Sequence, residues 1–274
     1  MKADLHNHSY YSDGVLSPSE VVKLASEAEC DLFSLTDHDT TDGIAEAQLE
    51  ADKLNLNLIS GVEISGLWRN MAIHILGLGI DVNNEILQTG LEHNQKLRKE
   101  RAEKIALDLW RSGIKDALEK TQSFSKTDML TRTHFAQMLI SEGYCKDMKA
   151  VFRRYLTGKK PGGVRVEWED FDEIVHWIHA AGGRAFIAHP FRYRMTHTKI
   201  KTMLNDFKCV LGDGIEVVTG TSSEEEIILG NQWADKYNLL ATCGSDFHGW
   251  PNQRVRIGNL RDLPDPEKAF WRYL

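Results

Sequence analysis

The stretch DLHNHSYYSDG (residues 4–14) sets two histidines and two aspartates close together near the start of the chain. Because successive side chains of a β-strand point to opposite faces, His6 and His8 share one face, and Asp13 follows in a loop. Imidazole and carboxylate groups at this density are common metal ligands. Asp4 lies on the face of His6 but one step deeper, so we expect a buried polar support and not a ligand. The stretch therefore predicts a first strand whose end and loop carry part of a metal site.

Strand-like and helix-like patterns alternate along most of the chain. Seven segments read as strands: 3–9, 31–38, 57–65, 71–80, 184–190, 214–219 and 239–248. Helical patterns lie near 40–54, 169–181, 196–208 and 222–237, and Ser17 and Pro18 begin another helix. Alternation of this kind predicts parallel strands covered by helices. Seven strands favour a closed α/β barrel over an open sheet.

Residues 84–161 interrupt the alternation with helical patterns and no clear strand. Residues 85–114 read as one or two helices, and residues 125–157 also read as helical. The run TGKKPGG (157–163) has the composition of a linker. The sequence thus predicts a barrel domain formed by residues 1–83 and 162–274, with residues 84–161 as a helical insertion domain.

Metal-ligand residue types recur at or beyond the C-terminal ends of the predicted strands, and in an α/β barrel that end carries the active site. Any one of them could be a structural residue or a helix cap, but their recurrence at equivalent positions indicates a common centre. The nine candidate ligands are His6, His8, Asp13, His38, Glu63, His74, His189, Asp246 and His248. Nine ligands exceed the four that one zinc ion takes and suit two or three ions. Nitrogen and oxygen donors without thiolates favour Mn, Fe or Zn.

The overall charge limits the class of partner. A net charge of −7 over 274 residues argues against a broad surface for long duplex nucleic acid, although it still allows a local basic pocket. Two or three divalent cations would outweigh the three carboxylates of the candidate centre, so the pocket favours a multiply anionic substrate such as a phosphate ester. No apolar run approaches the roughly 20 residues of a membrane helix, and the first residues do not read as a signal peptide. The four cysteines are far apart, which favours reduced thiols in a cytoplasmic protein.

The motifs DLHNHSYYSDG, LTDHDT, GVEIS, AHP and GSDFH resemble, in order and spacing, those of the PHP (polymerase and histidinol phosphatase) metallohydrolases. IHILGLGID, RTHFAQML and VFRRYL resemble the branch that contains nucleoside 3',5'-bisphosphate phosphatases and 5'-to-3' exoribonucleases. This resemblance implies a distorted (β/α)7 TIM-like barrel with a small helical insertion domain, and a centre of three divalent metal ions, often Mn. By position it implies three groups of ligands: His6, His8, Glu63 and Asp246; Glu63, His74 and His189; and Asp13, His38 and His248.

The insertion also carries candidate groups for binding a phosphate. Arg98 and Arg101 are three residues apart and share a helix face, although such a pair also fits the solvated end of a helix. Arg132 and His134 fall in the first turn of a predicted helix, where free N–H groups bind anions. The resemblance to the bisphosphate phosphatases makes these four groups a clamp for a second phosphate.

Three residues after the AHP motif are further candidates. Arg192 and Tyr193 are expected to contact the substrate, and a tyrosine ring can stack on a nucleobase. His197 is a weaker candidate for the acid that protonates the leaving group, and metal-bound water is the stronger one.

These features predict a metal-dependent phosphatase and phosphodiesterase. It would hydrolyse the 3'-phosphate of nucleoside 3',5'-bisphosphates through in-line attack by a metal-bridging hydroxide. The first phosphodiester of a short 5'-phosphorylated RNA occupies the same position, so one site would also act as a 5'-to-3' exonuclease. Two alternatives stay open: a histidinol-phosphate-type monophosphatase, which needs no clamp, and a noncatalytic metal-stabilised module.

Overall fold

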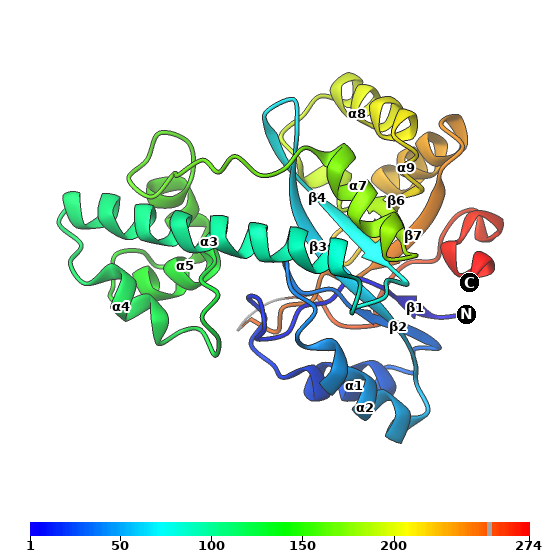
Figure 1. The fold of residues 1–274 in the computed structure, drawn as a ribbon, viewed down its shortest axis with the longest axis horizontal. Coiled ribbons are helices and arrows are strands. Elements are labelled where there is room, and N and C mark those ends of the chain that lie inside the picture. The colour runs from blue at the N-terminus through cyan, green and yellow to red at the C-terminus, as the bar shows by residue number, and fades with distance from the viewer. Residues whose placement is uncertain (251–253) are drawn as a thin grey trace.

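Within residues 1–250 and 254–274, which the computed structural model describes, seven strands form one sheet whose order follows the chain (Figure 1). They are β1 (Ala3–Asp4), β2 (Leu32–Leu35), β3 (Asn57–Trp68), β4 (Met71–Leu78), β5 (Arg184–Ile187), β6 (Gly214–Thr219) and β7 (Leu240–Gly244). The backbone N–H of Leu5 donates to the carbonyl of Cys243 at 3.0 Å, so β7 returns to β1 and closes the sheet. The predicted α/β barrel is confirmed, although β1 and β7 are shorter than expected.

One strand runs against the predicted direction. β4 is antiparallel to both β3 and β5, whereas the other neighbouring strands are parallel. Only Arg69 and Asn70 separate β3 from β4, and both have positive φ, 47° and 64°, the combination that a two-residue hairpin turn needs. Such a short link leaves no room for a crossover helix, so the expectation of parallel strands was wrong here. The reversal places His74, early in β4, at the same barrel end as the C-termini of the parallel strands, because it pairs with Ser65 of β3.

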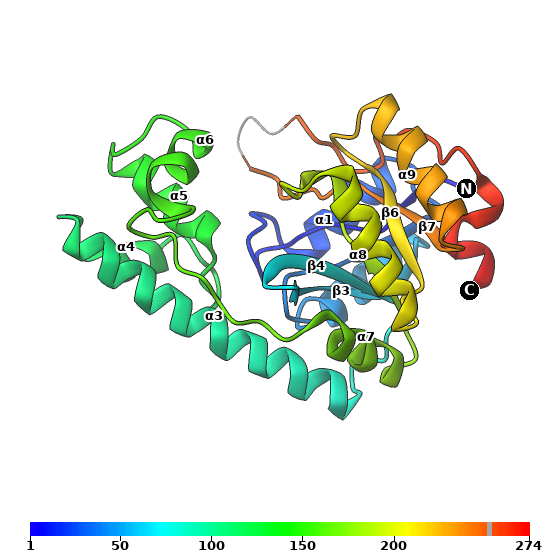
Figure 2. The ribbon, with the colours of Figure 1, turned by 90° about the horizontal axis from the view of Figure 1, so that it is seen from above.

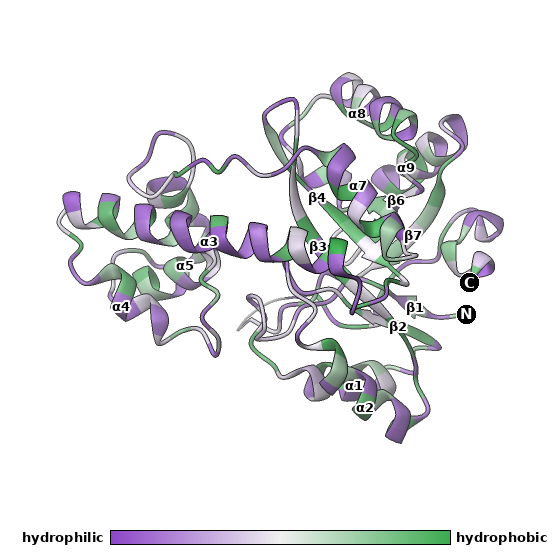
Figure 3. Ribbon diagram, in the orientation of Figure 1, coloured by the Kyte–Doolittle hydropathy of each residue, from purple (hydrophilic) through white to green (hydrophobic). Residues whose placement is uncertain are grey.

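Helices cover the outside of the barrel on two sides (Figure 1). α1 (Pro18–Glu27) and α2 (Ile44–Leu54) lie side by side next to β2, while α7 (Phe171–Ala180), α8 (His197–Cys209) and α9 (Glu224–Lys236) pack beside β4 to β7. Single 3-10 turns cover Pro190–Arg192, Pro266–Lys268 and Phe270–Tyr273. The apolar core lies between strands and helices, as Figure 3 shows by hydropathy. The barrel end that faces the insertion is instead filled with buried polar groups.

The insertion projects from one end of the barrel (Figures 1 and 2). It consists of α3 (Glu85–Arg111), α4 (Ala117–Gln122), α5 (Arg132–Ser141), α6 (Met148–Val151) and a π-helical turn (Phe152–Leu156). The expectation that 125–157 is helical was right in kind and wrong in extent, because α5 begins only at Arg132 and a loop that contains Gly143 separates it from α6.

α3 belongs to two hydrophobic cores. Leu87 and Leu91 near its start pack into the barrel core, whereas Ile105 and Leu109 belong to a separate core within the insertion. At Gly90 a Cβ atom would lie 2.4 Å from the ring of Trp177, so only glycine allows the helix to approach the barrel this closely. The change of core thus occurs inside α3, and the division of the chain at residues 84 and 161 stays a prediction.

Two further sequence expectations concern the environment of the chain. All four cysteines are free thiols, and Cys30 and Cys243 are buried. Among the helices of the described residues, none has both the length and the apolar character needed to span a bilayer.

Candidate active site

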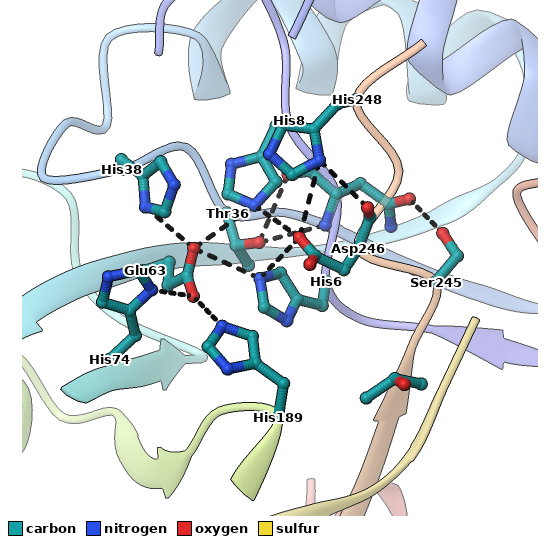
Figure 4. A network of polar contacts seen from close by, with 12 residues as sticks. His6, His8, Thr36, His38, Glu63, His74, His189, Ser245, Asp246 and His248 are labelled. Carbon is teal, nitrogen blue, oxygen red and sulfur yellow. Dashed lines mark hydrogen bonds and ion pairs between the residues drawn. The ribbon is translucent and has the colours of Figure 1, made fainter. Parts of the chain in front are cut away.

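Glu63 is the centre of a cluster of imidazole and carboxylate groups at the open end of the barrel (Figure 4). Its Oε1 lies 2.8 Å from Nδ1 of His74 and 2.9 Å from Nε2 of His189. Its Oε2 lies 2.8 Å from Nδ1 of His38. β3, β4, the loop after β2 and the end of β5 therefore converge on one carboxylate.

The segment after β1 supplies the adjoining part of the cluster, because β1 ends at Asp4 and the expectation that His6 and His8 lie within the first strand was wrong. Nε2 of His6 and of His8 lie 3.4 Å and 3.1 Å from Oδ1 of Asp246, and each lies 3.3 Å from Oε2 of Glu63. Both rings thus point to the same side, as the alternation of an extended chain requires. Asp246 follows β7, so the two ends of the chain meet at this point.

The loop after β1 completes the cluster. Oδ1 of Asp13 lies 3.2 Å from Nε2 of His248 and 3.7 Å from Nε2 of His38. Three overlapping groups have ligand atoms within 4.8 Å of one another: His8, Asp13, His38 and His248; His6, His8, Glu63 and Asp246; and His38, Glu63 and His74. The structure thus brings all nine predicted residues together. It groups His38 with Glu63 and His74 where we expected His189.

The polar atoms of this cluster fit metal ions. Nε2 of His6 and of His8, Oε2 of Glu63 and Oδ1 of Asp13 are buried, and none forms a hydrogen bond with another described residue. Buried polar atoms without partners are costly unless a ligand satisfies them. Mixed imidazole and carboxylate donors suit first-row divalent ions. The same environment favours positive charge: burial opposes protonation of His8, but Asp246 and Glu63 raise its pKa to about 10.

Glu216 of β6 supports two of these residues, and the sequence analysis missed it. It is fully buried, its Oε1 lies 3.0 Å from Nδ1 of His6, and its Oε2 accepts the backbone N–H of His189 at 2.6 Å. A carboxylate on the far nitrogen of a histidine fixes the ring so that the other nitrogen faces the metal. A lone glutamate in the otherwise apolar strand GIEVVT was the available signal.

Two aspartates hold the loops that carry the cluster. Asp37 accepts hydrogen bonds from the backbone N–H of Ser9 at 2.7 Å and the hydroxyl of Ser12 at 2.6 Å, which fixes the loop before Asp13. Asp4 accepts from the backbone N–H of Ser245 at 2.7 Å, next to Asp246. The expectation that Asp4 is a buried polar support is therefore confirmed.

A cavity of about 500 Å³ separates the cluster from the insertion. The barrel side is lined by cluster residues and Arg192, and the opposite side by residues of α3, α5 and the π-helical turn. The lining outside the cluster includes Ser65, Arg98, Arg101, Thr131, Arg132, Thr133, Phe152, Trp168, Arg192 and Trp250. Metal-binding groups on one wall and guanidinium groups on the other are suited to a substrate with two anionic ends.

The family model of the PHP domain matches residues 4–187. This range contains six of the nine cluster residues: His6, His8, Asp13, His38, Glu63 and His74. The chain belongs to the PHP domain family. A 3',5'-nucleoside bisphosphate phosphatase of Chromobacterium violaceum is 41% identical over 273 residues, which cover 99% of this chain and 95% of that protein. A 5'-3' exoribonuclease of Haemophilus influenzae is 37% identical and covers 98% of both chains. A solved structure of an amidohydrolase from C. violaceum, with bound sulfate and no metal, has a TM-score of 0.95 and 40% identity, over 100% of this chain and 95% of that one.

In this PHP protein the buried arginines of α3, Arg98 and Arg101, differ in whether a carboxylate neutralises them. Arg98 is paired with Asp39: its Nε lies 2.6 Å from Oδ2, and its Nη2 also reaches Ser65 at 2.8 Å. Arg101 is only 7% exposed, and among the described residues no carboxylate contacts it. Burial and the neighbouring Arg98 and Arg132 lower its pKa well below the usual range. Arg101 thus lines the cavity as a buried cation that no carboxylate contacts, and its guanidinium lies 5.4 Å from the centroid of the Trp168 ring.

Two predicted substrate residues, His134 and Tyr193, and the weaker acid candidate His197 are not among the residues that line the cavity. His134 completes the N-terminal cap of α5, where its Nδ1 accepts the backbone N–H of Thr131 at 3.2 Å. The hydroxyl of Tyr193 bonds to the backbone of His74, at 2.8 Å from the N–H and 3.3 Å from the carbonyl, so this ring is held as a structural group. His197 begins α8 and packs edge-on against Trp233, with ring centroids 5.6 Å apart. These positions do not support substrate contact for the three side chains.

Arg192 and Trp250 do reach the cavity of this PHP protein. Arg192 contacts Asp246, and its Nη2 lies 3.4 Å from the hydroxyl of Thr221. Trp250, which the sequence analysis did not single out, donates from Nε1 to the carbonyl of Asp13 at 2.7 Å, and its ring lies tilted against the ring of His248 with the centroids 4.2 Å apart.

Proposed function

We propose that this PHP protein is a metal-dependent phosphoesterase that removes the 3'-phosphate from nucleoside 3',5'-bisphosphates. The same site would hydrolyse the first phosphodiester of short 5'-phosphorylated RNA, acting as a 5'-to-3' exonuclease. The observation that carries the proposal is the buried guanidinium of Arg101, which no carboxylate of the described residues contacts, across a cavity of about 500 Å³ from the nine-residue cluster. The names of the two similar proteins, a bisphosphate phosphatase and a 5'-3' exoribonuclease, support it.

The proposed cofactors are three divalent metal ions, with Mn preferred and Fe or Zn as alternatives. The residues that would hold them are His6, His8, Asp13, His38, Glu63, His74, His189, Asp246 and His248. When bound, such ions polarise the phosphoryl group and lower the pKa of water so that it can attack at neutral pH. Glu63 would contribute both of its carboxylate oxygens to holding the ions, because Oε2 faces His38 and Oε1 faces His74.

The protein's own groups would position the substrate. Arg101 and Arg132 would bind the 5'-phosphate, and burial strengthens charge-assisted hydrogen bonds of this kind. Arg98, which is already neutralised by Asp39, would orient its neighbour and contribute less charge. Arg192 would contact the scissile phosphoryl group from the cluster side. Fixing both ends of the nucleotide supplies the orientation on which much of the rate enhancement depends.

The state of the cysteines bears on the compartment of the protein, and the volume of the cavity bears on the size of its partners. Four free thiols fit a reducing compartment, so we propose a cytoplasmic enzyme. A cavity of about 500 Å³ has the size of a site for one small ligand, so the partners would be single nucleotides or the 5' ends of short single strands and not long duplexes.

A phosphate-release assay with Mn²⁺ tests the proposal with four substrates: adenosine 3',5'-bisphosphate, adenosine 3'-monophosphate, histidinol phosphate and AMP. We expect the bisphosphate to be hydrolysed fastest and AMP not at all. Arg101→Gln should raise KM for the bisphosphate about ten- to a hundredfold, because a hydrogen bond to a charged group contributes about 1.5–3 kcal/mol. It should leave the 3'-monophosphate, which lacks the 5'-phosphate, almost unchanged.

Arg111→Gln is the matched control, since Arg111 lies on the same helix, is exposed and pairs only with Asp108 among the described residues. A preference for histidinol phosphate that Arg101→Gln does not change would favour the monophosphatase alternative. No turnover of any substrate with Mn, Fe or Zn would favour the noncatalytic module.

A further inference from the structure

Positive charge is concentrated in one segment near the end of the insertion, although the whole chain is acidic. Residues 146–165, here called the basic segment, contain the seven cations Lys146, Lys149, Arg153, Arg154, Lys159, Lys160 and Arg165 and one acidic residue, Asp147, a net of +6. The whole chain has a net charge of −7, so the other residues carry −13. So strong a local excess in an acidic protein indicates a surface for a polyanion.

The cations of the basic segment are exposed and available. None of the seven forms an ion pair with any residue in the described part of the chain, and all seven are exposed, although the guanidinium of Arg154 lies 5.3 Å from the centroid of the Tyr155 ring. The one carboxylate, Asp147, is occupied as the N-terminal cap of α6, where it accepts the backbone N–H of Ala150 at 2.7 Å. Like charges kept together without partners repel one another, so a bound anion would stabilise the segment.

The backbone of the basic segment is fixed. Val151, Tyr155 and Leu156 are buried in the core of the insertion, which leaves Arg153 and Arg154 on the outside. The turn that carries Lys159 and Lys160 is closed by a hydrogen bond from the N–H of Gly162 to the carbonyl of Tyr155 at 2.8 Å. The cations are thus presented by an ordered frame and not by a free linker.

The basic segment begins at the rim of the cavity. Phe152 lines the cavity and is half-buried, and the next two residues along the chain are Arg153 and Arg154. The guanidinium of Arg132, which also lines the cavity, lies 6.0 Å from the centroid of the Phe152 ring. Figure 2 shows α6, which leads into this turn, on the side of the insertion that faces the barrel.

We propose that the basic segment binds the sugar–phosphate backbone of a single-stranded RNA beyond its first nucleotide. The inference rests on the proposed function, because the cavity holds one nucleotide and any longer chain must leave it past the rim. Phosphates spaced along a flexible single strand suit several cations carried by one ordered segment, and aromatic groups such as Phe152 tolerate any base. The segment would make the enzyme prefer RNA over free bisphosphate as the strand becomes longer.

The test compares hydrolysis of adenosine 3',5'-bisphosphate with that of 5'-phosphorylated RNAs of 2, 4, 8 and 16 nucleotides. Arg153→Gln/Arg154→Gln should leave kcat and KM for the bisphosphate unchanged and raise KM for the longest RNA. For a single strand, each phosphate contact contributes about 0.7 to the slope of the logarithm of the binding constant against the logarithm of the salt concentration. Loss of one contact should therefore make this slope shallower by about 0.7 and weaken binding about fivefold at 0.1 M salt, relative to 1 M salt. Fluorescence anisotropy of the 16-nucleotide RNA with EDTA present measures the same loss without turnover.

The double variant Lys199→Gln/Lys208→Gln is the matched control, since it removes two exposed cations from α8 on the outside of the barrel. An equal loss of RNA affinity in this control, or RNA affinity that does not increase with length in the unmodified enzyme, would overturn the proposal. Binding of anionic vesicles that RNA does not displace would also overturn it, in favour of a membrane surface. If the bisphosphate is hydrolysed and only the RNA effects are missing, the proposed function stands and this inference alone fails.

Discussion

At the scale of single residues, Glu216 connects two proposed ligands that follow different strands, His6 after β1 and His189 after β5. It contacts the ring of His6 and the backbone of His189 and is shielded from water. This contact explains how the ring of His6 is held in place although β1 ends two residues before it. The geometry of the cluster therefore depends on a side chain that would touch neither metal nor substrate.

Glu216→Gln should weaken Mn²⁺ affinity about ten- to a hundredfold, because such supporting partners typically contribute this much to metal affinity. The amide keeps the size of the side chain and loses its charge. Competition for Mn²⁺ against a fluorescent chelator measures the affinity, and thermal unfolding of the metal-free variant shows whether the fold is intact. Glu225→Gln on the exposed face of α9 is the control. Unchanged Mn²⁺ affinity together with a lower melting temperature would mean that Glu216 only stabilises the fold.

The sequence predicted the cluster better than the opposite wall of the cavity. Ligand types at strand ends are visible because strand order and barrel geometry bring those ends together. The neutralisation of Arg98 by Asp39 joins residues 59 positions apart, and no local pattern reveals which of two neighbouring arginines keeps its charge. For the same reason the sequence does not reveal that Tyr193 and His134 bond to backbone groups.

At the scale of elements, α3 is the connection between the barrel and the insertion. Its first turns pack on the barrel through Gly90, and Arg101 lies three turns further along the same helix. The middle of α3 is strongly hydrophilic, as Figure 3 shows, and hydrogen bonds from Asn94 and Arg98 to Asp39 attach it directly to the barrel.

Gly90→Ala should destabilise the protein by about 1–3 kcal/mol, because the new methyl group would overlap the ring of Trp177. If α3 moves to relieve the overlap, KM for the bisphosphate should also rise, since Arg101 moves with the helix. Chemical denaturation gives the stability, and phosphate release gives KM. Thr89→Ala, one residue earlier and exposed, should have little effect on either. Equal stability of the two variants would show that the contact with Trp177 does not limit the approach of α3.

The positions of the strands could be predicted, but the direction of β4 could not. An alternation of apolar residues is the same in a parallel and an antiparallel strand. The direction follows from the link of two residues between β3 and β4, which is too short for a crossover. The predicted strands ended at 65 and began at 71, so the sequence did not show how short this link is. In the insertion, the helical pattern of 125–157 was visible, but the loop between α5 and α6 depends on tertiary packing.

At the scale of the whole molecule, the two ends of the chain and the middle of the sheet meet in one cluster. His6 and His8 lie near the start, Asp246 and His248 near the end, and Glu63 between them. Ions bound here would join segments that are far apart in sequence. A ligand that binds only the folded state stabilises it in proportion to the logarithm of its concentration over Kd.

Removal of metal should therefore lower the melting temperature of the whole protein. At a Mn²⁺ concentration of 100 Kd one ion adds about 2.7 kcal/mol, which in a chain of this size corresponds to several degrees. Differential scanning fluorimetry after dialysis against EDTA, followed by titration with Mn²⁺, should show a melting temperature that rises with ion concentration. In Glu63→Gln the rise should be much smaller, because the central carboxylate loses its charge while its size is kept. A melting temperature that does not respond to Mn, Fe or Zn would contradict the metal centre itself, since ions that bridge β1, β3 and β7 cannot bind without stabilising the closed barrel.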